Sequence, residues 1–231
     1  MSNELILIGF YVLILIYSII LHEISHGWVA LWLGDVTAKY AGRLSLNPKS
    51  HIDPIGSILV PIMLLLVSGG KMAFGWAKPV PYNPNNLRDR KKGELLVALS
   101  GPATNLLLAL VAVILSYLIN LSSVTKKEMI YNLNDWEKIT QMLSGSFESI
   151  AFILLVYVVF WNVILAFFNL IPIPPLDGSK ILYALFPLDI KTKIFLEQYG
   201  FFILLFIMIF FGGLINGLMS WALNIFFSLM I

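Results

Sequence analysis

The chain has 231 residues, of which 59% are hydrophobic and 12% are charged, and its mean hydropathy is +0.88. Because soluble domains carry roughly 25% charged residues, this composition excludes an ordinary soluble domain and indicates an integral membrane protein surrounded by lipid. The net charge of +2 gives no reason to expect a nucleic-acid partner, and the absence of cysteine excludes disulfides and thiolate metal ligands.

Four apolar segments each reach the ~20 residues that a helix needs to cross ~30 Å of hydrocarbon. They cover residues 4–33, 93–121, 146–171 and 199–230. We therefore predict an all-α polytopic membrane protein with about four long transmembrane helices. We expect residues 1–231 to form a single membrane-embedded domain, with a core at 4–185 and a C-terminal span at 199–230. Gly212 and Gly213 leave open whether that last span is one tilted helix or a broken pair.

The first apolar segment, residues 4–33, is expected to be a retained helix, because no basic region precedes it and no small-residue cleavage site follows it. It contains the stretch "HEISH". On a helix, His22 and His26 lie about 40° apart around the axis and one turn along it, and Glu23 lies about 100° from His22. Two imidazoles with this spacing can hold one zinc ion, and the glutamate is placed to take a proton from water.

The membrane setting strengthens the zinc interpretation. An ionisable group deep in a bilayer costs about 2.5–3.5 kcal/mol on insertion scales, so three such groups on one arc of a helix need a common explanation. Binding of one metal ion by these side chains explains why all three occur there. His22 follows Glu4 by about 27 Å of helix, so the site is expected inside the membrane and nearer the end of the segment at Gly34.

Charge along the chain predicts the topology. Residues 34–92 contain nine of the fifteen Lys and Arg residues. The positive-inside tendency places this segment and residues 172–198 in the cytoplasm, with the 122–145 loop on the opposite side. This topology requires the shorter apolar segment, residues 54–70, to be a re-entrant hairpin, which its prolines and glycines favour. A short kinked helix that spans the membrane is the alternative.

Two pieces of the cytoplasmic segment are expected to be extended. In residues 38–47, Tyr40, Leu44 and Leu46 alternate with polar residues, the pattern of a half-buried strand. The prolines of "WAKPVPYNP", residues 76–84, exclude a helix and favour an edge strand or polyproline geometry. Either piece would offer an edge that holds an unwound substrate by strand addition.

A catalytic zinc commonly has three protein ligands, so a third is needed. His51, Asp53 and Asp177 are all expected near the cytoplasmic face, and their spacing does not choose among them. We interpret His51 as a turn or interfacial residue. Asp177 follows "IPIPP", whose prolines force an extended chain that can turn a carboxylate back into a cavity. A membrane metal-ion transporter that uses the same His and Asp side chains is the main alternative to an enzyme.

Several motifs together resemble a known family. "HEISH" in a membrane segment and "NLIPIPPLDG" after a later one resemble the paired signatures of the site-2 proteases, which are intramembrane zinc metalloproteases. "SGPATN" at residues 100–105 resembles a further element of that family. "HIDPIG" and "GWAKPVPYNP" resemble its small prokaryotic members without a PDZ domain. The resemblance extends over about residues 20–185.

The resemblance implies a function and the roles of four residues. His22, His26 and Asp177 would bind one zinc ion per chain, and Glu23 would be the catalytic acid and base. The implied reaction is hydrolysis of peptide bonds in or near transmembrane segments of other membrane proteins. The implied location is a prokaryotic inner membrane, with the active site towards the cytoplasmic side. Oligomeric state and substrate identity stay open.

Two asparagines are weaker candidates for catalytic residues. Asn169 precedes Asp177 by eight residues, as in the family motif, and is a candidate hydrogen-bond donor to substrate or to the developing oxyanion. Asn105 ends "SGPATN" and is a candidate of the same kind. An amide in an apolar membrane helix also serves simply to join helices, and this alternative stays open for both residues.

Overall fold

The computed structural model describes residues 2–67, 69–70, 75–143, 146–186 and 188–231, and within them every regular element is a helix. The long helices are α1 (Ser2–Trp32), α4 (Arg90–Ser116), α7 (Phe147–Asn169), α9 (Ile190–Phe210) and α10 (Gly212–Ser228). The short ones are α2 (Thr37–Tyr40), η1 (Pro48–Ser50), η2 (Pro54–Leu59), α3 (Val60–Val67), η3 (Pro84–Asn86), α5 (Ser123–Tyr131), α6 (Trp136–Met142) and α8 (Asp177–Leu185).

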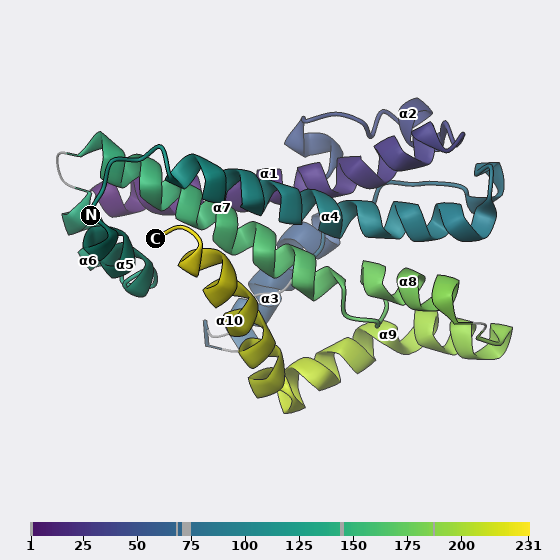
Figure 1. Ribbon diagram of the computed structural model, residues 1–231. Coiled ribbons are helices and arrows are strands. Elements are labelled where there is room, and N and C mark those ends of the chain that lie inside the picture. The colour runs from purple at the N-terminus through teal and green to yellow at the C-terminus, as the bar shows by residue number, and fades with distance from the viewer. Residues whose placement is uncertain (1, 68, 71–74, 144–145, 187) are drawn as a thin grey trace.

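Four helices, α1, α4, α7 and α9, are long and apolar enough to cross a membrane. This confirms the predicted all-α membrane protein. The first three correspond to the expected spans. The fourth span differs from its predicted bounds, because α9 already begins at Ile190 and the chain breaks at Phe211 between α9 and α10. Figure 1 shows these two helices meeting at an angle, so the broken pair is correct.

The core lies where α1, α4 and α7 pack against one another, with α10 on α7 (Figure 1). On α7 the large side chains of Phe152, Val156 and Tyr157 are fully buried. On α4 the small residues Ala109 and Ala112 face this cluster. Small side chains let membrane helices approach closely, so α4 can contact both of its neighbours along much of its length.

After the short apolar segment, the chain lies again beside the start of that segment's helix. This helix, Pro54–Val67, is about 21 Å long at 1.5 Å per residue, which is too short to cross ~30 Å of hydrocarbon. The Trp76 N–H donates to the Gly56 carbonyl at 3.1 Å, and the Ser57 hydroxyl donates to the Trp76 carbonyl at 2.8 Å. The chain is therefore back beside the start of this helix by residue 76, as the hairpin interpretation predicts.

The predicted strands are wrong, since no strand occurs in the part of the chain that the structure describes. Tyr40 belongs to α2 and is 83% exposed, whereas Arg43, expected on the polar side, is 6% exposed. The physical reason is Gly42, whose φ of +66° interrupts the extended run and shifts the alternation. Residues 76–83 are neither helical nor paired as a strand, so the exclusion of helix is correct for all of 76–84 except Pro84, which begins the short helix η3.

Asp35 ties the end of α1 to the loop before α4. It is fully buried and accepts hydrogen bonds from Thr37 N and Oγ1, from Asn83 N and from Asn86 Nδ2. Burial by itself raises the pKa of Asp35, but these hydrogen bonds outweigh it and lower the pKa below its ordinary value. The carboxylate therefore stabilises this corner of the fold.

Asp35→Asn is expected to reduce the free energy of unfolding by about 1–2 kcal/mol at pH 7, because the donors around it lose a charged acceptor. Since the folded pKa lies below the unfolded value of ~3.9, this contribution is present above the unfolded pKa and disappears as the pH falls through the folded pKa. Thermal unfolding in detergent should show a gap between wild type and variant at pH 7 that narrows towards pH 3. The exposed Asp189→Asn should show no such gap. A gap independent of pH would contradict the assignment.

Candidate active site

Three buried side chains from two helices meet at one point. His22 and His26 lie on α1, and Asp177 is the first residue of α8. His22 Nε2 is 3.0 Å and His26 Nε2 is 3.2 Å from Asp177 Oδ2, and the two Nε2 atoms are 3.2 Å apart. Ligand atoms bound tetrahedrally to zinc at about 2.0–2.2 Å lie ~3.3 Å from one another. The three atoms thus have nearly the spacing of a zinc ligand set.

The protonation of the two imidazoles supports a cation at this point. His22 Nδ1 lies 2.5 Å from Asn105 Oδ1, and His26 Nδ1 lies 2.7 Å from the Val97 carbonyl oxygen. Because both oxygens only accept, each Nδ1 must carry the hydrogen. When the imidazoles are neutral, each Nε2 then presents a lone pair towards Asp177 Oδ2, which has no hydrogen-bond partner. Two neutral imidazole nitrogens and one carboxylate oxygen that converge in a buried site are a ligand set that fits zinc.

Asn105 orients His22 from behind. Its Nδ2 donates to Asn162 Oδ1 at 2.7 Å, and Asn162 Nδ2 donates to the Ser18 hydroxyl at 2.9 Å. Asn162 Nδ2 also donates to the Val158 carbonyl, which can only accept, and this bond fixes which end of the Asn105 amide faces His22. The network joins α1, α4 and α7 in the buried core. Sequence analysis missed Asn162, although a single amide within the apolar run "VVFWNVIL" would have drawn attention to it.

Asn169, the other candidate amide, is occupied within its own helix. Its Nδ2 donates to the Leu165 carbonyl at 2.9 Å. In this arrangement the Asn105 and Asn169 amide groups donate to Asn162 and Leu165 rather than to the ligand atoms. Each of these bonds uses one hydrogen of the amide group, so the catalytic roles that the sequence suggested for the two residues stay predictions.

Glu23 stands beside the three converging atoms. One ligand atom each of His22, Glu23 and His26 lie within 4.8 Å of one another. Glu23 is nevertheless less suited than Asp177 to be the third ligand, because the Val80 N–H donates to Glu23 Oε2 at 2.9 Å. A carboxylate close to a metal but held by another group is placed to exchange a proton with water at the site.

The other candidates for the third ligand have different partners. His51 Nε2 lies 2.7 Å from the Ser45 carbonyl oxygen. Asp53 Oδ1 accepts from the backbone N–H groups of Ile55 and Gly56 and caps the short helix that follows. The structure therefore brings Asp177, and neither of these two, to the histidines.

Gly101 lets both histidines lie against α4. A Cβ atom at this position would be 2.5–2.6 Å from ring atoms of His22 and His26, closer than real contacts allow. Gly101→Ala is therefore expected to displace the imidazoles and weaken zinc binding by at least about 10-fold, the lower end of what loss of ligand support costs. Competition with a chromogenic chelator measures this. Ala103→Leu, at an exposed position of the same helix, should bind zinc like wild type. Equal affinity for Gly101→Ala would show that the rings do not pack here.

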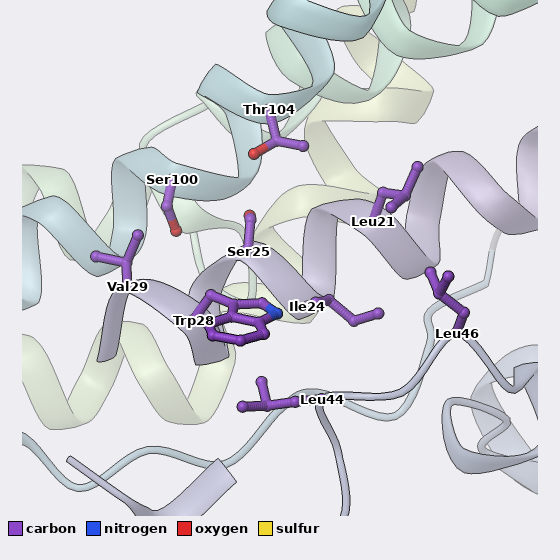
Figure 2. A pocket seen from close by; sticks show the side chains of 9 residues that line it. All are labelled: Leu21, Ile24, Ser25, Trp28, Val29, Leu44, Leu46, Ser100 and Thr104. Carbon is purple, nitrogen blue, oxygen red and sulfur yellow. The ribbon is translucent and has the colours of Figure 1, made fainter. Parts of the chain in front are cut away.

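A groove runs along the side of α1 opposite to Glu23. It is lined mainly by apolar residues of α1 and by Leu44 and Leu46, and Figure 2 shows Ser25, Ser100 and Thr104 pointing into the space between α1 and α4. Ser25 lies two residues after Glu23, which is 200° around the helix axis. The groove therefore does not open towards the Glu23 carboxylate.

Comparison with known proteins gives concordant matches. A family model described as Peptidase family M50 matches residues 10–211. YwhC, a candidate zinc metalloprotease of Bacillus subtilis, is 35% identical over 200 residues, which are 86% of this chain and 80% of that protein. Candidate zinc metalloproteases called Rip2 are similar too. The one from Mycolicibacterium smegmatis is 29% identical over 44% of this chain and 39% of its own length. The one from Mycobacterium tuberculosis is 26% identical over 161 residues, which are 70% of this chain and 51% of that protein. No solved structure gives a significant match.

Proposed function

This chain belongs to peptidase family M50, the site-2 protease family, and on that premise we propose that it is an intramembrane zinc metalloprotease. Its substrates would be other membrane proteins, cut in or beside their transmembrane segments, as in regulated intramembrane proteolysis. One observation carries the proposal: His22 Nε2, His26 Nε2 and Asp177 Oδ2 converge beside Glu23, in a chain with four helices able to cross a membrane.

The side of the membrane on which the site opens is also part of the proposal. The Lys and Arg distribution favours a cytoplasmic position for residues 34–92 and 172–198. Asp177 follows α7, and the two histidines lie in the last third of α1, so both ligand-bearing ends point to the same side. The return of the chain at Trp76 to Gly56 supports this topology. We assign the site to the cytoplasmic side of a prokaryotic inner membrane.

The chemistry requires a proton acceptor that later becomes a donor. When bound by His22, His26 and Asp177, one zinc ion supplies a Lewis acid that polarises the scissile carbonyl and acidifies water. Glu23 accepts a proton from the attacking water and then gives it to the nitrogen of the departing amine, so the carboxylate ends each cycle ionised. The Asn105 network keeps His22 in the tautomer whose Nε2 is free.

Zinc removal tests the proposed function. Purified protein is expected to hold one zinc per chain and to cleave a generic transmembrane substrate in detergent or liposomes. A strong chelator should abolish cleavage, and zinc should restore it while magnesium does not, because nitrogen ligands suit zinc. Cleavage that survives complete zinc removal would contradict the proposal. Metal flux across liposomes by a protein that cleaves nothing would identify a transporter instead.

A further inference from the structure

Glu23 is held from outside its own helix by a segment that belongs to neither zinc-binding motif. We propose that the Val80 backbone N–H and the Arg43 side chain act together as positioning groups for the Glu23 carboxylate. This inference rests on the proposed function, since it concerns the geometry of the same carboxylate. Neither group touches the reacting atoms, and both act through Glu23.

Val80 is the sole backbone donor in its tripeptide. The segment reads Pro79, Val80, Pro81, and proline has no N–H group, so one amide hydrogen is available between residues 79 and 81. That hydrogen is donated to Glu23 Oε2 at 2.9 Å. The two prolines fix φ on either side and stiffen the backbone that presents it. A single, rigidly presented donor therefore meets one oxygen of the carboxylate.

Hydrogen bonds to both backbone groups of Lys78 fix its position. Its N–H donates to the His51 carbonyl at 2.9 Å, and its carbonyl accepts from Arg43 Nη2. Arg43 is almost fully buried. Because Lys78 is two residues before Val80 and the intervening residue is a proline, these hydrogen bonds set where the Val80 N–H points.

The Val80 side chain packs closely against α1 at Gly27. Gly27 lies one helical turn after Glu23, and a Cβ atom there would be 2.9 Å from Val80 Cγ1 and 2.6 Å from Leu44 Cδ2. The glycine thus allows the segment to approach α1 closely enough for the hydrogen bond. Val80 is itself buried, so the contact is shielded from water and correspondingly strong.

The arrangement has a direct consequence for proton transfer. With Oε2 held by Val80, the carboxylate cannot rotate freely, and Oε1 has no donor within the described residues, which leaves it for water. A misplacement of about 1 Å can cost roughly 100-fold in rate when a group must meet a reacting atom. Loss of the positioning groups should therefore lower kcat without removing zinc or weakening substrate binding.

Hydrogen exchange tests the contact without any need for activity. In Glu23→Ala the acceptor is gone, and the Val80 amide is expected to exchange at least about 10-fold faster than in wild type. The Lys78 amide, which is bonded to His51, serves as an internal control and should keep its protection. An unchanged Val80 rate would overturn the proposal. A wild-type protein that holds zinc but cleaves nothing would instead contradict the proposed function, and the exchange result would still decide the contact.

Kinetics test the consequence. Val80→Pro removes the N–H and is expected to lower kcat by about 10- to 100-fold, with KM within about 2-fold and zinc content unchanged. Val80→Ala keeps the N–H and should lose no more than about 3-fold. Arg43→Ala should lower kcat, and Arg43→Lys, which can still donate to the Lys78 carbonyl, should restore part of it. Equal losses in Val80→Pro and Val80→Ala would overturn the proposal. If Val80→Pro does not fold, a backbone ester at position 80 gives the same comparison.

Discussion

Glu23→Gln is expected to abolish peptide-bond cleavage while zinc content stays at the wild-type level. Glutamine has nearly the shape of glutamate, and its carbonyl oxygen can still accept the Val80 N–H, so the local structure should persist. It cannot take a proton from water at neutral pH. General acid and base catalysis contributes about 100- to 10,000-fold, and under the proposed function one residue serves as both acid and base. We therefore expect a loss of at least about 1,000-fold in kcat.

The measurement compares cleavage of a transmembrane substrate with zinc content for the same preparation. Glu94→Gln is a matched control, because Glu94 is a partly exposed residue of α4 that pairs with Arg90 four residues before it. It should cleave like wild type. If Glu23→Gln kept more than about a tenth of the wild-type kcat, Glu23 would not be the general base, and the proton would have to go elsewhere.

The pair of histidines in the candidate site could be predicted from local sequence. His22 and His26 are fixed relative to each other by helix geometry alone, so their spacing was sufficient. Asp177 could not be reached that way, because it lies on a different element. Spacing left it equal to His51 and Asp53, and only the motif resemblance selected it. The structure brings it to the histidines because α4 packs on both α1 and α8.

The parts that could not be predicted depend on tertiary contacts. The alternation around Tyr40 suggested a strand, but it is overridden by the turn at Gly42 and by the burial of Arg43 against Lys78. The hydrogen bond from Val80 to Glu23 joins residues 57 positions apart and depends on a backbone group, which a residue pattern does not reveal. Hydrophobic periodicity reports which faces are apolar, and it is silent about single polar contacts between distant segments.

Asp177→Ala is expected to abolish zinc binding together with cleavage. Without the carboxylate, two neutral imidazoles would have to hold a doubly charged ion in a buried site, where no negative ligand balances its charge. Loss of an orienting group around a metal already costs about 10- to 100-fold in affinity, so loss of a ligand should cost more than about 100-fold. Zinc content after dialysis and chelator competition measure the effect.

Asp53→Ala separates this result from a general loss of structure. Asp53 was an equal candidate by spacing, but it caps a short helix by accepting from Ile55 N and Gly56 N. Its loss should cost about 1 kcal/mol of stability, as for other caps, and leave zinc content intact. Asp177→Asn should fall between wild type and Asp177→Ala, because the amide oxygen keeps the position but lacks the charge. Zinc retained by Asp177→Ala and lost by Asp53→Ala would move the third ligand to Asp53, which would require the hairpin at residues 54–70 to lie against α1 differently.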